Sequence, residues 1–274
     1  MKGKIMKLRY IFCGITSCLF LGISSCSLDY DPVDTYSDVT EGMTDTGEKV
    51  VFKNKAAVVG HLTTIYNQMR DRQEHWYVDL LLIADSHADN AYAGTTGAEV
   101  LPFENNSIEG SNSVLERDWN RYMEDVARAN ILICNIDAVT DNALTTTERA
   151  QYKAEAKIFR AMVMFDMVRL WGDFPVITTV ADDITSDNID EVYPQYFPAQ
   201  NTELEAYQQI EKDLLDAVLY APDNTAGNKT LFTKSVARTL LAKIYAEKPL
   251  RDYAKVIRYC DEVKADGFDL VEDF

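Results

Sequence analysis

The sequence predicts an all-α fold in which tetratricopeptide-like helical hairpins are joined by long irregular loops. Three observations support this class. Apolar side chains recur at helical spacing in six segments after residue 53. Helix-start signals precede two of these segments. Strand signals are sparse, and the best of them covers residues 174–178.

Each of the six segments has one apolar face, which we expect to lie in the core. In an amphipathic helix the apolar residues fall three or four positions apart and form a stripe along one side. The six stripes are Val58, Leu62, Ile65, Tyr66 and Met69; Leu115, Trp119, Tyr122, Val126, Ala129 and Ile133; Tyr152, Ala156, Phe159, Val163, Met167 and Leu170; Tyr207, Ile210, Leu214 and Val218; Leu240, Leu241 and Ile244; and Tyr253, Val256, Ile257 and Cys260.

Helix boundaries are also marked. Thr145 with Glu148, and Thr202 with Glu205, have the spacing of capping boxes, in which a hydroxyl and a carboxylate satisfy free N–H groups of the first turn. Gly172 follows the third stripe, and glycine is common just after a helix end. We therefore expect helices to begin after the two threonines and one helix to end before Gly172.

The last two stripes predict a tetratricopeptide-type hairpin, with helices over residues 234–247 and 252–265. The run from Leu241 to Tyr245 matches the L-[G/A]-x-x-Y core of that repeat, and Ala254 falls at the small position of the second helix. Arg238 replaces the tryptophan usual in the first helix. The match is therefore partial.

Two long segments lack a helical pattern, residues 86–111 and 172–201. Loops of this length in a compact domain tend to be functional, and solvated connections are the alternative. Both combine aromatic with polar groups, which suits sugar rings because their faces are apolar and their rims carry hydroxyls. We expect ligand contacts to come from these loops and favour the first. The side chains concerned are Asp89, Asn90 and Tyr92 in the first loop and Tyr193, Tyr196 and Phe197 in the second.

The amino terminus has the pattern of an export signal. Four basic residues are followed by an apolar run of 13 residues, which is shorter than the ~20 needed to span a bilayer. Residues 23–26, Ile-Ser-Ser-Cys, resemble a bacterial lipobox, so we expect Cys26 to carry a lipid anchor; an ordinary secretory signal is the alternative. We expect residues 1–25 to be the signal peptide, residues 26–50 a flexible acidic tether, and residues 51–274 the folded body.

The charge balance narrows the classes of partner. The chain has 44 acidic and 27 basic residues, a net charge of −17, and all of the acids lie after residue 25. A nucleic-acid surface needs a cationic footprint, so we expect no nucleic-acid partner. Anionic lipid headgroups also attract basic surfaces, so we expect membrane contact through the lipid anchor only.

No catalytic constellation stands out. His61, His75 and His87 form no metalloprotease or zinc pattern, and a glycosidase would need a buried carboxylate pair, which the sequence does not locate. We therefore expect no enzymatic activity, no metal and no cofactor. Cys134 and Cys260 lie in helical patterns, and we expect buried free thiols in preference to a disulfide.

Residues 155–178, EAKIFRAMVMFDMVRLWGDFPVIT, resemble the signature of the SusD/RagB family of outer-membrane nutrient-binding lipoproteins. Phe174 stands where that family prefers an aliphatic residue. Supporting segments follow in the family's order and cover essentially the whole mature chain. The matching residues are Glu155, Ala156, Phe159, Arg160, Ala161, Phe165, Arg169, Trp171, Gly172, Asp173 and Pro175, supported by Trp119, Tyr122, Ala129, Asn130, Asp213, Leu214, Ala217, Val236, Ala237, Arg238, Leu240, Leu241 and Ala242.

This resemblance implies a binding protein on the outer face of the outer membrane. It would take up an oligosaccharide or peptide and hand it to a SusC-like TonB-dependent transporter. Members of the family are usually longer than this chain, so we expect millimolar binding or none for the chain as given, about −4 kcal/mol at best. The alternatives are a tetratricopeptide scaffold lipoprotein in envelope assembly and a truncated fragment that binds nothing.

Three charges interrupt the apolar segment that carries the motif, namely Arg160, Asp166 and Arg169. Charges persist in such a helix when they are paired, and Asp166 lies one helical turn from Arg169. We expect all three to be structural. Replacing Arg160 or Asp166 by alanine should cost about 3 kcal/mol if the partner is left buried and unpaired.

Overall fold

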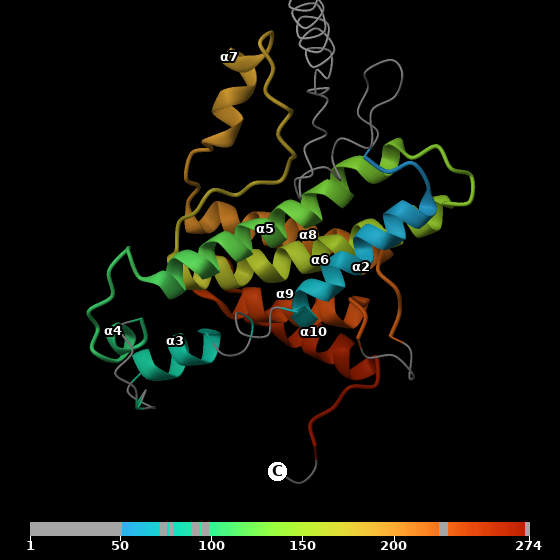
Figure 1. Cartoon of the computed structure of the whole chain (residues 1–274). Helices are drawn as coiled ribbons and strands as arrows, with labels where there is room; N and C mark the ends of the chain where they lie inside the picture. Colours follow the sequence, from blue (N-terminus) through green and yellow to red (C-terminus); the bar gives the residue numbers. More distant parts are fainter. Residues whose placement is uncertain are drawn as a thin grey trace, which may run out of the picture. The chain divides into compact units, whose positions relative to one another are not determined.

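The computed structural model describes residues 51–71, 76, 79–88, 92, 94, 99–224 and 230–271, all within one unit that spans Thr44–Phe274. In these ranges every regular element is a helix, which confirms the all-α prediction (Figure 1). Residues 174–178, which carry the best strand signal, form only an isolated antiparallel bridge between Phe174 and Asn201. The elements are α2 (Lys55–Asp71), α3 (Leu80–His87), α4 (Leu101–Glu104), α5 (Ser113–Asn135), η3 (Ile136–Ala138), α6 (Thr146–Trp171), α7 (Ile189–Val192), η4 (Tyr193–Tyr196), α8 (Glu203–Tyr220), α9 (Lys234–Ala246), η5 (Lys248–Leu250) and α10 (Tyr253–Ala265).

The predicted signal peptide, Cys26 and the tether occupy residues 1–50, which lie outside the described residues. The expectations for that segment stay predictions. Of the helices that the structure describes, none is both long and apolar enough to cross a membrane.

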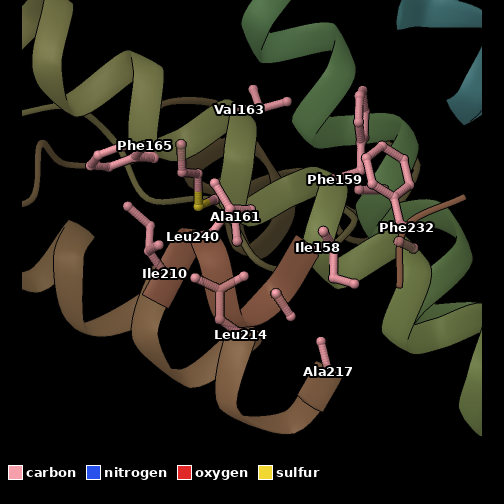
Figure 2. Packing of buried hydrophobic residues seen from close by; sticks show 14 of the residues in the cluster. Ile158, Phe159, Ala161, Val163, Phe165, Ile210, Leu214, Ala217, Phe232 and Leu240 are labelled. Carbon is pink, nitrogen blue, oxygen red and sulfur yellow. The ribbon is translucent and has the colours of Figure 1, made fainter. Parts of the chain in front are cut away.

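Helix α6 is the centre of the core, because helices pack on several of its sides. It contacts α5 and α8 most extensively and also touches α2 and α9. Ile158 and Ala161 of α6 lie opposite Leu214 and Ala217 of α8, and all four side chains are fully buried (Figure 2). Burying one leucine or isoleucine side chain stabilises a fold by roughly 1.5–3 kcal/mol, so this contact contributes much of the stability.

A polar link holds α2 against α6 and the segment that precedes α9. The Tyr66 hydroxyl donates to Glu155 Oε2 at 2.6 Å and accepts from the Phe232 backbone N–H at 2.9 Å. Its ring stacks on Phe232 at a centroid distance of 4.8 Å. Burial raises the pKa of Glu155, while the hydrogen bonds from Tyr66 and Gln151 oppose that rise. Glu155, the first residue of the motif, is therefore a packing residue of the scaffold.

Both predicted capping boxes are present. The Thr145 hydroxyl accepts from the Glu148 N–H at 3.2 Å, and Glu148 Oε2 accepts from the Thr145 N–H at 3.1 Å. Thr202 and Glu205 make the same pair of bonds at 3.3 and 2.8 Å. Lys55 Nζ lies 2.6 Å from Glu148 Oε1 and joins α2 to this helix start. The hydrogen bonds to Glu148, that from Lys55 first, lower its pKa to about 2.

The predicted hairpin is formed by α9 and α10, which pack against each other. Tyr245 and Tyr259 stack across the pair with ring centroids 5.9 Å apart. Arg238, which replaces the usual tryptophan, bridges to Glu262 at 3.1 Å and to Asp266 at 2.7 Å. An inter-helix ion pair thus stands where an aromatic side chain would pack.

The predicted apolar face of α10 is wrong in part. Its buried side runs through Val256, which is half-buried, and Tyr259, which is 4% exposed. Among the helices, α10 packs chiefly on α9, and a single neighbour covers only a narrow stripe. The residues that we expected on the buried side but that are exposed are Tyr253, Ile257 and Cys260.

The expectation of buried thiols is also wrong. Cys134 and Cys260 are free and exposed. In α5 the buried side passes through Ala129, Asn130 and Leu132, which turns Cys134 outward near the end of the helix. Cys134 Sγ lies 3.6 Å from the Thr178 carbonyl oxygen, at the edge of the second long loop.

Candidate functional site

The end of the motif turns the chain out of α6 and back to the start of α8. Helix α6 stops at Gly172, whose φ of 71° lies in a region that favours glycine, and whose N–H donates to the Val168 carbonyl. Asp173 Oδ1 then accepts from the Glu203 backbone N–H at 2.7 Å, in the first turn of α8. Phe174 is buried. The residues that form the motif therefore fix two helix ends.

Residues 172–201, which we call the arm, are closed at their base by backbone and side-chain bonds. The Asn201 N–H donates to the Phe174 carbonyl at 3.0 Å, and Asn201 Oδ1 accepts from the Val176 N–H at 2.9 Å. Gln200 Nε2 donates to the Asp173 carbonyl at 2.6 Å. The two ends of the arm are thus held side by side.

A buried polar cluster holds the arm against α5, α6 and α8. Arg160 is 3% exposed, and its guanidinium donates to the two carboxylate oxygens of Asp213 at 2.8 and 2.7 Å. It also donates to Asn130 Oδ1 at 2.6 Å and to the Thr178 carbonyl at 3.4 Å. Asn130 Nδ2 in turn donates to the Ile177 carbonyl at 3.0 Å. Motif residues from three helices therefore meet at the root of the arm.

The expected pairing of the motif charges is confirmed for Arg160, whose partner is buried. Asp166 and Arg169 also pair, but closer to the surface. Asp166 and Arg169 do pair, at 3.6 Å, but the Arg169 side chain is 48% exposed. Arg169 also lies over the Phe165 ring, 5.2 Å from its centroid. Because an exposed ion pair contributes at most about 1 kcal/mol, this pair is a smaller structural element than the sequence predicted.

The aromatic residues of the motif are packed against one another. Trp171 meets Trp119 and Tyr122 edge to face, with ring centroids 5.3 and 5.6 Å apart. Tyr122 also meets Trp76 at 5.4 Å. Such contacts stabilise a fold beyond their area alone. These rings pack on the core of the scaffold, Tyr122 and Trp76 buried and Trp119 and Trp171 partly buried.

The outer part of the arm, by contrast, displays its aromatic side chains. Tyr193, Tyr196 and Phe197 are 53%, 48% and 66% exposed. The rings of Tyr193 and Phe197 lie 4.9 Å apart between centroids, at 49° to each other. The Tyr196 hydroxyl donates to the Asp182 carbonyl at 2.9 Å, which closes the arm across 14 positions. Figure 1 shows this tip, at α7, away from the helices that hold the root.

A family model described as "Starch-binding associating with outer membrane", of the SusD-like type, matches residues 36–246. The chain belongs to the SusD-like family. The resemblance carried by residues 155–178 is therefore confirmed. In this SusD-like chain the motif forms the end of α6, the buried cluster and the root of the arm.

Relatives of known sequence and structure agree with this assignment. A SusD-like protein of Bacteroides ovatus is 26% identical over 242 residues, 88% of this chain and 39% of that protein. SusD-like protein P2 of Formosa agariphila is 28% identical over 165 residues, 60% of this chain and 30% of that protein. The chain spans less than half the length of these relatives.

Solved structures show the same fold. A laminarin-binding SusD-like protein aligns with a TM-score of 0.65 and 22% identity over 80% of this chain and 47% of its own. A SusD-like protein from Bacteroides fragilis aligns with a TM-score of 0.66 and 21% identity, over 84% of this chain and 42% of its own. At these identities the likeness carries the fold alone.

The loop that we favoured for ligand contacts, residues 86–111, is described only in part. Tyr92 is 80% exposed, whereas Asp89 and Asn90 lie outside the described residues. The end of the loop is fixed, because Asn112 Nδ2 donates to the Glu99 carbonyl at 2.8 Å and Phe103 is buried. The assignment of Asp89, Asn90 and Tyr92 to a ligand stays a prediction.

A buried carboxylate pair, which the sequence did not locate, lies at the start of α3. Asp79 and Asp118 are 3% and 2% exposed, and Arg117 contacts both. Burial raises the pKa of Asp79, the neighbouring Asp118 raises it further, and Arg117 opposes the rise. Burial and the contacts with Arg117 thus place the two carboxylates within the packed scaffold.

Among the described residues, no three His, Cys, Asp or Glu side chains gather in a way that could hold a metal ion.

Proposed function

We propose that this SusD-like chain is a lipid-anchored protein on the outward face of the outer membrane. Cys26 carries the lipid, and the body binds an oligosaccharide and hands it to a SusC-like TonB-dependent transporter. Family membership supports the outer-membrane location and the ligand class. The lipobox-like residues 23–26 support the anchor.

The observation that carries the proposal is the placement of exposed aromatic side chains. Of the six exposed aromatic residues in the described part of the chain, four lie in the two long loops and two on α8 and α10, whereas the motif aromatics pack on the core. Loops on a rigid scaffold commonly carry binding residues. The exposed aromatic residues among those described are Tyr92, Tyr193, Tyr196, Phe197, Tyr220 and Tyr253.

In the first loop we propose that Asp89, Asn90 and Tyr92 contact the ligand. They offer a carboxylate, an amide and an aromatic face within four positions. Hydroxyls at a sugar's rim would bond to the first two groups, and its C–H face would stack on the third. The protein would bind its ligand without cleaving it.

Calorimetric or NMR titration against glycan and peptide panels tests the ligand class. We expect weak binding to oligosaccharides, about −4 kcal/mol, which is millimolar. Tyr92→Ala combined with Asn90→Ala should remove the part of the binding free energy that the first loop contributes, and so weaken binding. Binding to peptides alone, or release of shorter sugars, would overturn the proposal.

Co-purification from the outer membrane tests the transporter. After mild crosslinking of cells that express the native lipoprotein, a TonB-dependent transporter should be the main partner found by mass spectrometry. The same pull-down with Cys26→Ser protein is the control for membrane placement. Recovery of envelope-assembly proteins in place of a transporter would favour the scaffold alternative.

A further inference from the structure

The arm is held by hydrogen bonds at both of its ends. Besides the hydrogen bonds at its root, it has others near its tip. Asn188 Oδ1 accepts from the Thr185 N–H at 2.7 Å, and Asn188 Nδ2 donates to the Asp183 carbonyl at 3.0 Å. Val192 of α7 is buried. A surface that is ordered before a ligand arrives loses less conformational entropy on binding.

At the tip, two aromatic rings are exposed to solvent. Tyr193 and Phe197 leave more than half of their surface exposed while they touch each other. Ile184 and Ile189 are also exposed, at 43% and 47%. Exposed apolar clusters on a held loop mark a binding surface, because nothing in the packing requires them.

The charge of the arm is of one sign. Residues 172–201 contain six acidic residues and no lysine, arginine or histidine. Asp187, Asp190 and Glu191 lie directly before the aromatic pair in sequence, and all three are exposed. Carboxylates accept hydrogen bonds from hydroxyl groups but repel carboxylate and sulfate groups.

We propose that the tip of the arm is a saccharide-binding surface selective for neutral glycans. Tyr193 and Phe197 contact the apolar faces of the sugar rings, and Asp187, Asp190 and Glu191 accept from their hydroxyls. Glycans that carry uronic acid or sulfate groups are disfavoured by repulsion. This inference rests on the proposed glycan-binding function and adds a second contact surface to the one predicted in residues 86–111.

A small ligand fits the tip better than a protein partner. A standard protein interface buries about 800 Å² on each side and involves roughly 20–30 residues. The tip offers two touching rings and their immediate neighbours, interspersed with carboxylates. That scale matches a few sugar units.

The test compares matched variants of the whole chain by NMR or affinity-gel titration. The probes are maltoheptaose and a laminarin oligosaccharide as neutral glycans, and an alginate oligosaccharide as the anionic one. The tip variant is Tyr193→Ala with Phe197→Ala. The control is Tyr220→Ala with Tyr253→Ala, which removes two aromatic side chains that are 50% and 60% exposed on helices. Thermal melts confirm that each variant folds.

We expect the tip variant to lose about tenfold in affinity for a neutral probe, which equals about 1.4 kcal/mol, while the control variant matches wild type. Asp187→Asn, Asp190→Asn and Glu191→Gln together should raise affinity for the anionic probe, and added salt should do the same in wild type.

The outcomes separate the two proposals. If wild type binds a neutral glycan and the tip variant binds it equally well, the tip is not a binding surface, but the proposed function stands. If wild type binds no glycan, both fail. Loss of transporter co-purification by the tip variant, with glycan affinity unchanged, would assign the tip to a protein contact and overturn the inference.

Discussion

Arg160 offers the sharpest test of how the scaffold holds its loops, because its ion pair with Asp213 is buried. Its side chain is 4% exposed and that of Asp213 is 2% exposed. Replacing Arg160 by alanine leaves the Asp213 carboxylate buried, with Gln209 Nε2 at 3.1 Å as its remaining side-chain donor among the described residues. Removing one partner of a buried ion pair costs about 3–5 kcal/mol, since the other charge stays desolvated.

Helix α6 also supplies a matched control for this change. Lys157 lies 2.6 Å from Asp216, so it too joins α6 to α8, but the two side chains are 19% and 37% exposed. Lys157→Ala should therefore cost no more than about 1 kcal/mol. The double variant Arg160→Met with Asp213→Leu removes both buried charges and should recover most of the stability lost by Arg160→Ala.

Urea denaturation and thermal melting measure these differences. In a domain of this size, 1 kcal/mol shifts Tm by about 2–4 °C, so Arg160→Ala should lower Tm by roughly 6 °C or more. Hydrogen exchange should also rise at the root of the arm, because Arg160 and Asn130 hold the carbonyls of residues 177 and 178. A loss of stability no larger than that of Lys157→Ala would refute the reasoning.

Three further predictions follow from single contacts. Cys26→Ser should release the protein from the membrane fraction and abolish lipid labelling; a variant that stays membrane-bound and labelled would place the anchor elsewhere. Asp173→Ala removes the acceptor for the Glu203 N–H, so it should lower the unfolding free energy measured in urea titrations by about 1 kcal/mol. An unchanged unfolding free energy would mean that solvent replaces this hydrogen bond. Folding lowers the pKa of Glu148 from 4.5 to about 2. The ionised carboxylate therefore stabilises the fold above pH 4.5, and this contribution to stability is lost as the pH falls towards 2. The difference in stability between wild type and Glu148→Gln should narrow over that range, and a constant difference would contradict the prediction.

Much of the fold was predictable because its determinants are local. The capping boxes at Thr145 and Thr202 depend on residues three positions apart, and both are present. Apolar stripes located the long helices for the same reason. The stripe on α10 failed because its buried side depends on which helices pack on it, and spacing alone does not contain that information.

The candidate site was less predictable because its contacts join distant parts of the chain. Arg160 and Asp213 are 53 positions apart, and Asn130 reaches a carbonyl 47 positions away. The motif could be recognised in the sequence, but its role at the root of the arm needs the three-dimensional neighbours. Asp79 and Asp118 escaped prediction in the same way, since nothing local to either residue indicates that they meet.

The ranking of the two loops depends on a second kind of long-range information, namely exposure. Both loops mix aromatic and polar residues, and the close spacing of Asp89, Asn90 and Tyr92 favoured the first. In the structure, Phe103 turns inward and Tyr92 is exposed, while Tyr193 and Phe197 of the arm are exposed and touch each other. The buried groups at the root help to hold the arm: Arg160 and Asn130 bond the carbonyls of residues 178 and 177, next to the buried Phe174. A scaffold that commits a desolvated ion pair to the root of a loop is better explained by a function at the tip than by the need to connect α6 to α8, which a short turn would do.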